Sequence, residues 1–420
     1  MRCKYSTQIV FKLLVFVIQT DFASLLCPQQ CVCNEKHLTV NCLSQNLGQI
    51  PITLNPKVKE LYLDENKIKK ISSSLNVYFK LETLSLTANR IVAIDEHSFV
   101  NSRSLRFLNL EKNNVKLVTN TTFHGLGSLL TLKLRSNLIE SLPKNTFYDL
   151  NNLEELDLSD NKISEISEDA FVGLSNLKYL SLRENKLSML PRLPSALSNL
   201  LNLDLGFNYF QVETNVGDRF DRLLNLNELR LDYCWIKRFT VDSQILINKL
   251  DLRGNQIEFL DRSDLWSNVG GVQCVDIREN PINCNCSWKW IQVWLSNRTE
   301  NEINCDLMLQ TQCSQSEHKL IELNFDTICH KESTEKTFAW YLVFIFIFIF
   351  IFIAFALIVY TKVQRCPKAN TSYEWLQEEK RMRSSSNADP SSKVTFTVSI
   401  NRASLLILNN NRKVLENTHL

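Results

Sequence analysis

One eleven-residue pattern recurs along most of the chain and constrains its fold more than any other feature. The pattern reads L-x-x-L-x-L-x-x-N-x-L, and successive copies lie about two dozen residues apart. The ten copies begin at Val58, Leu81, Leu105, Leu129, Leu153, Leu177, Leu200, Leu226, Ile247 and Val272. The fifth copy, LEELDLSDNKI from Leu153 to Ile163, is nearly ideal. These matches predict a stack of similar structural units.

The residue types in each copy fit one turn of a solenoid. Alternating apolar positions belong to a short strand whose apolar side chains point inward, and the asparagine satisfies backbone groups where the chain turns. No copy buries its apolar face alone, so stacked copies share one core and pair their strands into a parallel sheet. We therefore predict a curved solenoid over residues 58–282, with the sheet on its concave side.

Other features of the repeats are interpreted as structural. Convex-side core positions are expected at Phe99, Phe123, Phe147 and Phe171. Cys234 takes the asparagine position of the eighth copy, and we interpret it as a buried structural thiol. An insertion, QVETNVGDRFDR at 211–222, predicts a loop on one rim.

Cysteines cluster on both sides of the repeats. The chain has thirteen, and the pattern C-P-x-x-C-x-C-x8-C precedes the first copy, while NPINCNCSWKWIQVWL and three later cysteines follow the last copy. An open solenoid exposes its core at each end and needs a cap there. Together with the repeats, these segments resemble the cysteine caps of extracellular leucine-rich-repeat proteins, from about Cys27 to Cys329. An α/β leucine-rich-repeat solenoid with caps at 25–57 and 283–330 is expected.

The resemblance implies a pattern of disulfides. In the N-terminal cap it pairs Cys27 with Cys33 and Cys31 with Cys42. In the C-terminal cap, Cys284 and Cys286 each take a downstream partner among Cys305, Cys313 and Cys329. Five cap cysteines leave one over, and Cys274 is near enough in sequence to pair with it. A zinc site built from the Cys-x-Cys motif is the alternative. We interpret the tryptophan-rich stretch after it as a helix that seals the last repeat.

Two apolar segments indicate export and membrane anchoring. Residues 1–24 have the basic start and apolar stretch of a signal peptide. Residues 338–360 carry no charge and exceed the roughly 20 residues that a transmembrane helix needs. Basic residues follow that segment closely, so we place the tail, 361–420, in the cytoplasm and a short stalk at 331–337. The expected protein is a single-pass type I protein of the plasma membrane.

Short motifs predict modifications and tail contacts. Glycan acceptor patterns stand at Asn120, Asn285 and Asn297, and Asn285 lies between two cap cysteines. In the tail, which is expected to be disordered, Cys366 is a palmitoylation candidate. Tyr373-Glu-Trp-Leu376 has the form of an endocytic sorting signal, and the C-terminal residues Thr418, His419 and Leu420 resemble a ligand of PDZ-domain scaffolds.

The outward strand positions give a map of the concave face. Tyr62, Phe107 and Tyr179 fall on it together with Arg135 and Arg183, and such residue types anchor protein interfaces. A protein ligand is therefore expected. Aspartates interrupt any basic stripe that a polyanion would need. An acidic column and a basic column also run side by side, and these charges can instead pair with one another. Their members are Asp157, Asp204, Asp251 and Asp276, and Arg135, Arg183, Arg253 and Arg278.

These features together favour binding over catalysis. The net charge of +2 excludes a general affinity for nucleic acid, and no catalytic motif, metal site or cofactor site is evident. The layout resembles neuronal leucine-rich-repeat transmembrane adhesion proteins, and the repeats with their caps also resemble Toll-like receptors and Slit. That resemblance implies a recognition or adhesion receptor whose tail recruits scaffold or sorting proteins. The alternatives are an auxiliary subunit that modulates or traffics a channel or receptor in the same membrane, and a pattern-recognition co-receptor.

Overall fold

The computed structural model describes residues 27–210, 214–215, 217–220, 222–240, 247–260, 274–291, 310–314 and 318–364. The chain divides into two compact units, Met1–Lys336 and Thr337–Leu420. Several predictions lie outside the described residues. They are the signal peptide at 1–24, the positions Cys305 and Asn297, and the tail motifs at Cys366, Tyr373, Leu376, Thr418 and Leu420.

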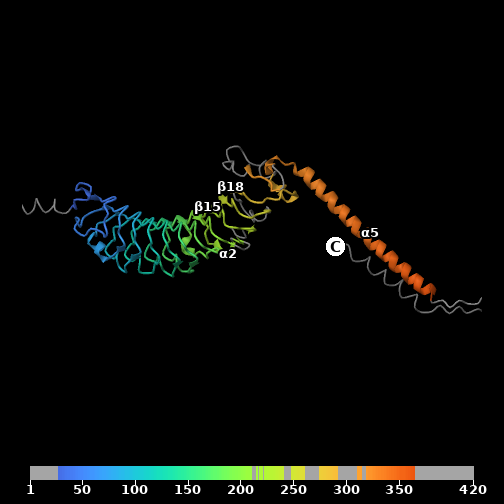
Figure 1. Ribbon diagram of the computed structural model, residues 1–420, viewed down its shortest axis with the longest axis horizontal. Coiled ribbons are helices and arrows are strands. Elements are labelled where there is room, and N and C mark those ends of the chain that lie inside the picture. Colours follow the sequence, from blue (N-terminus) through green and yellow to red (C-terminus); the bar gives the residue numbers. More distant parts are fainter. Residues whose placement is uncertain are drawn as a thin grey trace, which may run out of the picture. The chain divides into compact units, whose positions relative to one another are not determined.

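A twelve-stranded sheet runs the length of the first unit. Its first two strands, β1 (Val32–Asn34) and β2 (Thr39–Asn41), form an antiparallel hairpin, and every later strand pairs in parallel with its neighbours. Each predicted copy contributes one strand. In order these are β3 (Glu60–Tyr62), β5 (Thr83–Ser85), β7 (Phe107–Asn109), β8 (Thr131–Lys133), β10 (Glu155–Asp157), β12 (Tyr179–Ser181), β13 (Asn202–Asp204), β15 (Glu228–Arg230), β17 (Lys249–Asp251) and β18 (Cys274–Asp276). The long sheet lines the inner side of a curved solenoid (Figure 1).

The asparagine of each copy holds neighbouring turns together. In the fourth copy, Asn137 Nδ2 donates to the carbonyl oxygens of Leu110 and Leu134 at 2.9 and 3.0 Å, while Oδ1 accepts from the backbone N–H of Val115 at 3.0 Å. One buried amide thus satisfies backbone groups of two consecutive turns, and the arrangement repeats along the solenoid. In the eighth copy Cys234 replaces the asparagine, and its thiol donates to the carbonyl oxygens of Leu205 and Asp232 at 3.3 and 3.4 Å. Burial raises the pKa of its thiol to about 12, as fits a structural residue.

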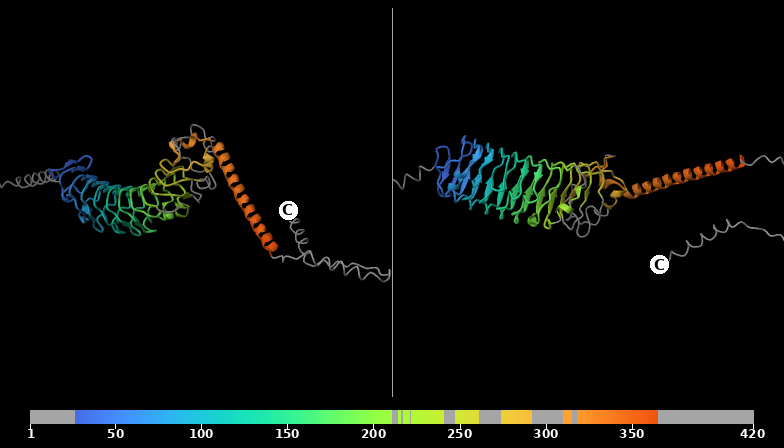
Figure 2. Two further views of the ribbon diagram at one scale, coloured as in Figure 1. Left: turned by 45° about the vertical axis from the view of Figure 1, so that its right-hand side comes forward. Right: turned by 90° about the horizontal axis from the view of Figure 1, so that it is seen from below.

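The outer side of the solenoid is built from short segments and an apolar core. Phe99, Phe123, Phe147 and Phe171 are all buried, and the last three stack with ring centroids about 6 Å apart, at 5.8 and 6.0 Å. Two-residue strands pair on this side: β4 (Lys70–Ile71) with β6 (Ala93–Ile94), β9 (Ser141–Leu142) with β11 (Glu165–Ile166), and β14 (Thr214–Asn215) with β16 (Phe239–Thr240). The 3-10 turns η1 (Ser73–Val77) and η2 (Ser195–Leu197) lie between repeat strands in the chain. Figure 2 shows the regular stacking of the turns from two further directions.

The insertion at 211–222, for which we predicted a loop, includes regular secondary structure. Its described part contains β14 and the short helix α2 (Gly217–Phe220), and the Phe220 side chain is fully buried. The repeat pattern is broken in this stretch, so periodicity carried no signal for either element. Burial of Phe220 anchors the insertion to the core.

Disulfides close both ends of the solenoid. The N-terminal cap has Cys27–Cys33 and Cys31–Cys42, the pairs that the resemblance implied. The C-terminal cap has Cys284–Cys313 and Cys286–Cys329, and Cys274 is also disulfide-bonded. Trp288, at the end of η3 (Cys286–Trp288), is fully buried against the core, and η5 (Leu320–Glu322) follows.

One helix of the described chain has the length and composition to cross a membrane. It is α5 (Phe325–Gln364), and its apolar portion covers Phe338–Lys362, which includes the predicted span at 338–360. The helix begins earlier than we expected, so the predicted stalk at 331–337 is helical. The side chains of the apolar portion are not buried within the protein. An exposed apolar helix of this length fits a lipid environment.

Candidate ligand-binding surface

Three outward columns of side chains cover the concave sheet. They come from the first and third residue of each repeat strand and from the second residue after it, because alternate strand residues face the same side. Tyr62 lies on β3, Phe107 on β7 and Tyr179 on β12. One strand, β5, separates Tyr62 from Phe107, and two strands, β8 and β10, separate Phe107 from Tyr179. The predicted aromatic residues share one face, but they do not form one cluster.

The predicted aromatic and basic residues differ in how much of each is accessible. Tyr62 and Phe107 are half-buried, Tyr179 is 36% exposed, and Arg135 is exposed with no ion pair in the described part of the chain. The Tyr62 hydroxyl donates to Glu60 at 3.4 Å, and burial is the main cause that raises its pKa. Burial also raises the pKa of Tyr179. Both hydroxyls therefore stay neutral at physiological pH.

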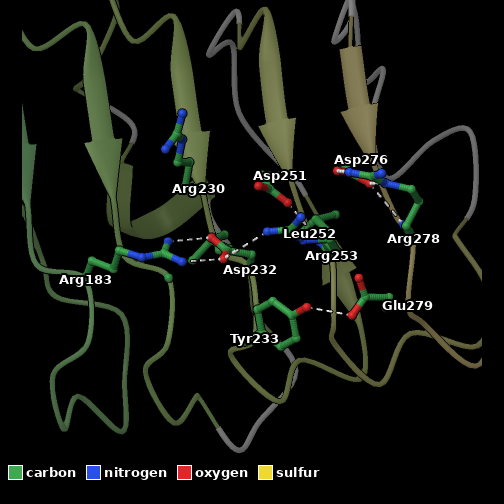
Figure 3. Close-up of polar contacts among 12 residues, drawn as sticks. Arg183, Arg230, Asp232, Tyr233, Asp251, Leu252, Arg253, Asp276, Arg278 and Glu279 are labelled. Carbon is green, nitrogen blue, oxygen red and sulfur yellow. Dashed lines mark hydrogen bonds and ion pairs between the residues drawn. The ribbon is translucent and has the colours of Figure 1, made fainter. Parts of the chain in front are cut away.

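Arg183 has a different role from the other predicted residues. Its guanidinium donates two parallel hydrogen bonds to Asp232, from Nη1 to Oδ1 at 2.9 Å and from Nη2 to Oδ2 at 2.8 Å. Figure 3 shows this bidentate interaction, the Arg183–Asp232 fork, extending across the face of the sheet. Asp232 is 1% exposed at its side chain, and Asp204 lies 3.4 Å from the same guanidinium. Hydrogen bonding to Asp232 raises the pKa of Arg183 further above its usual value. Arg183 is thus committed to a contact within the protein.

Gly206 makes that contact possible. Arg183 and Asp232 belong to the sixth and eighth copies, and Gly206 stands at the equivalent position of the copy between them. A Cβ atom at Gly206 would lie 2.4 Å from Arg183 Nη1 and 2.4 Å from Asp232 Oδ1. The glycine therefore leaves the space through which the arginine reaches across one repeat. Sequence reading missed Asp232 and Gly206 because their role depends on a residue two copies away.

Charge pairing continues toward the C-terminal end of the sheet. Arg278 forms a fork with Asp276 at 2.9 and 2.7 Å, and Arg230 Nε donates to Glu228 at 2.7 Å. Arg253 lies 3.9 Å from Asp232. Among the described residues, Asp251 has no side-chain partner as close as these, and burial, helped by Asp232 and Asp276, raises its pKa to about 6. Most charges in this half of the concave face therefore pair within the protein. Arg278 pairs with Asp276 across the two columns, as the alternative interpretation expected, whereas the main partner of Arg183 is Asp232, which lies in the same column as Arg183.

A second group of residues lies beside the asparagine ladder at one rim. Phe207 and Tyr209 flank Asn208 in the seventh copy, and Tyr233 and Trp235 flank Cys234 in the eighth. Phe207, Tyr209 and Trp235 are 40%, 51% and 55% exposed. We call these four residues the aromatic rim. The sequence signal was available, since aromatic residues occupy these two flanking positions in no other copy.

The aromatic rim borders a hollow of about 600 Å³. Glu184, Lys186 and the side chains of the asparagine ladder complete its lining. The rings of Phe207 and Tyr233 pack at a tilt of 32° with centroids 4.6 Å apart. Tyr233 donates its hydroxyl proton to Glu279 at 2.6 Å (Figure 3). Within the described residues, no group of three or more His, Cys, Asp or Glu is arranged to hold a metal ion. The concave face and this rim are candidate ligand-binding surfaces.

Sequence comparison addresses the repeats directly. A family profile described as "Leucine rich repeat" matches residues 79–139 and 128–187, which include the strands from β5 to β12. These turns are leucine-rich repeats. Human oligodendrocyte-myelin glycoprotein is 31% identical over 85 residues, which cover 20% of this chain and 19% of that protein. Zebrafish leucine-rich repeat-containing protein 3 is 37% identical over 108 residues, covering 24% of this chain and 40% of that protein. The matched region thus spans less than half of either relative.

Solved structures agree with the fold of the leucine-rich-repeat domain. A chain from the octameric complex of latrophilin 3, Unc5D and FLRT2 superimposes with a TM-score of 0.51 and 23% identity, covering 71% of this chain and 98% of that chain. A chain from the mouse RP105/MD-1 complex gives a TM-score of 0.52 with 20% identity, covering 68% of this chain and 53% of that chain. Both likenesses, at 23% and 20% identity, support the solenoid fold of the leucine-rich-repeat domain.

Proposed function

We propose that the chain is a single-pass recognition receptor of the plasma membrane that binds a protein ligand on the concave face of its extracellular repeats. The main support for this proposal is the contrast, on that face, between arginines that pair within the protein and side chains that stay accessible. From the sixth copy onward, Arg183, Arg230 and Arg278 are held in ion pairs within the protein. Arg135 in the fourth copy is exposed, and Tyr62, Phe107 and Tyr179 are partly accessible between the first and sixth copies. Aromatic and arginine side chains on a curved solenoid face are the usual anchors of protein ligands.

The topology is part of the same proposal. The apolar part of α5 serves as the membrane span, the repeats face the outside, where their cap disulfides are stable, and the tail faces the cytoplasm. Asn120, which is exposed between β7 and β8, then carries a glycan, as do Asn285 and Asn297 in the C-terminal cap. In the tail, Cys366 accepts a palmitoyl group, Tyr373 and Leu376 form a sorting signal, and Thr418 to Leu420 recruit a PDZ-domain scaffold.

Direct binding tests the proposal. The secreted extracellular region, residues 25–336, is applied to an array of cell-surface and matrix proteins, and a variant carrying Tyr62→Ser, Phe107→Ser and Tyr179→Ser is applied in parallel. Tyr148→Ser is the matched control, because Tyr148 is an exposed aromatic residue of the outer side. We expect a specific partner whose binding is lost in the triple variant and kept in the control.

Two outcomes contradict the concave-face proposal. Binding that survives the triple variant places the ligand on another surface. An array without any partner favours the auxiliary-subunit alternative, in which the chain acts on a channel or receptor of its own membrane. Co-purification of the full chain with such a membrane protein, lost when the span is replaced, then identifies that role.

A further inference from the structure

The aromatic rim stands out because it places bulky side chains at positions with a left-handed backbone. In all ten copies the residue before the ladder position has a left-handed backbone, with φ of 55° at Phe207 and 54° at Tyr233. Bulky side chains are uncommon in this conformation, and small or polar residues suit it better. Most other copies place a charged or small residue at this point. Two aromatic residues in adjacent copies therefore call for an explanation outside the core.

Two of the rim's rings already bind arginine side chains of the same chain. The Arg183 guanidinium lies 4.5 Å from the centroid of Phe207, and the Arg253 guanidinium lies 5.5 Å from that of Tyr233. The face of an aromatic ring carries negative electrostatic potential, and tryptophan attracts cations most strongly. Tyr209 and Trp235 are the most exposed members of the rim, and no cation stacks on either ring within the described residues.

The charge beside these two rings complements a cation. Glu184 lines the same hollow, and its side chain is 47% exposed. Its nearest cation is Arg183 Nε at 3.7 Å, but that guanidinium is already held by two hydrogen bonds from its Nη atoms to Asp232. The Glu184 carboxylate is therefore left with weak internal neutralisation. Lys186 is the one basic residue of the lining, and its charge repels a cationic ligand.

We propose that the aromatic rim is a second binding surface, which receives an arginine side chain from a loop of a protein partner. The guanidinium stacks on Trp235 and Tyr209 and forms an ion pair with Glu184. Arginine suits this site better than lysine, because its planar group stacks on rings and is more weakly hydrated. The site is separate from Tyr62, Phe107 and Tyr179, so it does not depend on the proposed concave ligand.

Selection of peptides tests the chemistry without a known partner. The full chain in lipid nanodiscs is used to sort a displayed library of random linear peptides, and the recovered sequences are compared with those recovered on Trp235→Ala. We expect arginine to be enriched on the wild-type protein, with recovery of arginine peptides reduced roughly tenfold by Trp235→Ala or Tyr209→Ala. Tyr148→Ala is the matched control and keeps the enrichment.

Substitutions that change the charge of Glu184 and Lys186 distinguish a cationic ligand from an anionic one. Glu184→Gln should weaken binding of a selected arginine peptide, and Lys186→Glu should strengthen it, each severalfold, without loss of the folded-state circular dichroism spectrum. The Tyr62→Ser, Phe107→Ser and Tyr179→Ser variant should bind the peptide normally. Enrichment of acidic peptides, with Lys186→Glu weakening them, overturns the proposal, as does an unchanged peptide pool on Trp235→Ala.

Discussion

The lack of a side chain at Gly206 affects the stability of an ion pair between the sixth and eighth copies, Arg183–Asp232. Gly206→Ala places a methyl group in the path between Arg183 and Asp232, so the fork must open or the strands must shift. Because Asp232 is almost fully buried, loss of its partner leaves a poorly compensated charge. We expect the free energy of unfolding to fall by about 2 to 4 kcal/mol, measured by chemical denaturation.

Gly48→Ala is the matched control for this substitution. A Cβ atom at Gly48 meets no heavy atom within 4 Å. The control should therefore change the free energy of unfolding by less than about 0.5 kcal/mol. Equal effects of the two substitutions would contradict the assigned role of Gly206.

Asp251 predicts a pH dependence of stability. Its pKa in the folded protein is about 6, above the value of roughly 3.9 for an unfolded chain, so the folded state holds this proton more tightly. The contribution of Asp251 to stability is therefore complete at low pH and is lost as the pH rises from about 4 to about 6. Asp251→Asn removes the buried charge. We expect it to raise the free energy of unfolding at pH 7 by about 1 to 2 kcal/mol, allowing for partial exposure.

The same variant carries its own control. An asparagine resembles the protonated aspartic acid, so the two proteins should have equal stability at pH 4 and diverge as the pH rises. Thermal unfolding across this range measures the difference. A constant difference at all pH values would show that the substitution acts through packing instead of charge.

At the scale of elements, the stacked phenylalanines of the outer side should act as one column. Phe147 lies between Phe123 and Phe171 and is fully buried, so Phe147→Ala removes ring contacts with two neighbouring turns. We expect a loss of about 3 to 5 kcal/mol in the free energy of unfolding. The adjacent Tyr148 is 58% exposed, and Tyr148→Ala should cost less than about 1 kcal/mol. Similar losses of stability at both positions would contradict a specific contribution from the stacked phenylalanine rings.

The elements that sequence predicts well are those encoded by local alternation. In the fifth copy the pattern starts at Leu153, and β10 occupies Glu155–Asp157, because inward and outward residues alternate within a single strand. The caps were also recognisable from cysteine spacing. The start of α5 at Phe325 was missed, although the preceding Asn324 is a typical N-cap residue. Its Oδ1 accepts from the backbone N–H groups of Asp326 and Thr327 at 3.1 and 3.3 Å.

The candidate site was harder to predict than the fold. Tyr62, Phe107 and Tyr179 were placed correctly on outward strand positions, but the sequence did not reveal that Arg183 reaches Asp232. That contact depends on the lack of a side chain in the intervening turn and on burial, which are properties of the stack. The sequence shows aromatic residues on both sides of the ladder position in the seventh and eighth copies. Only the structure shows that these four residues line one hollow.

For the whole molecule, the proposed topology predicts where glycans are attached. Asn120 is exposed in the third turn, on the side of the membrane span that we place outside the cell. Asn120→Gln should remove one glycan, seen as faster migration on a denaturing gel, and the wild-type protein should show the same change after glycosidase treatment. Asn370→Gln is the matched control, because its acceptor motif lies in the proposed cytoplasmic tail. A glycan on Asn370 would show that the tail lies outside the cell, which would contradict the proposed topology.

The identical register of successive strands bears on how such a gene changes in evolution. Phe107 faces Thr131, and Thr131 faces Glu155, so loss of residues 129–152 brings β7 beside β10 with every inward position still aligned. In-frame duplication or loss of one unit thus alters the reach of the domain while both ends stay intact. A chain lacking residues 129–152 should be exported and unfold in one transition. Failure to be exported would show that individual turns are not exchangeable.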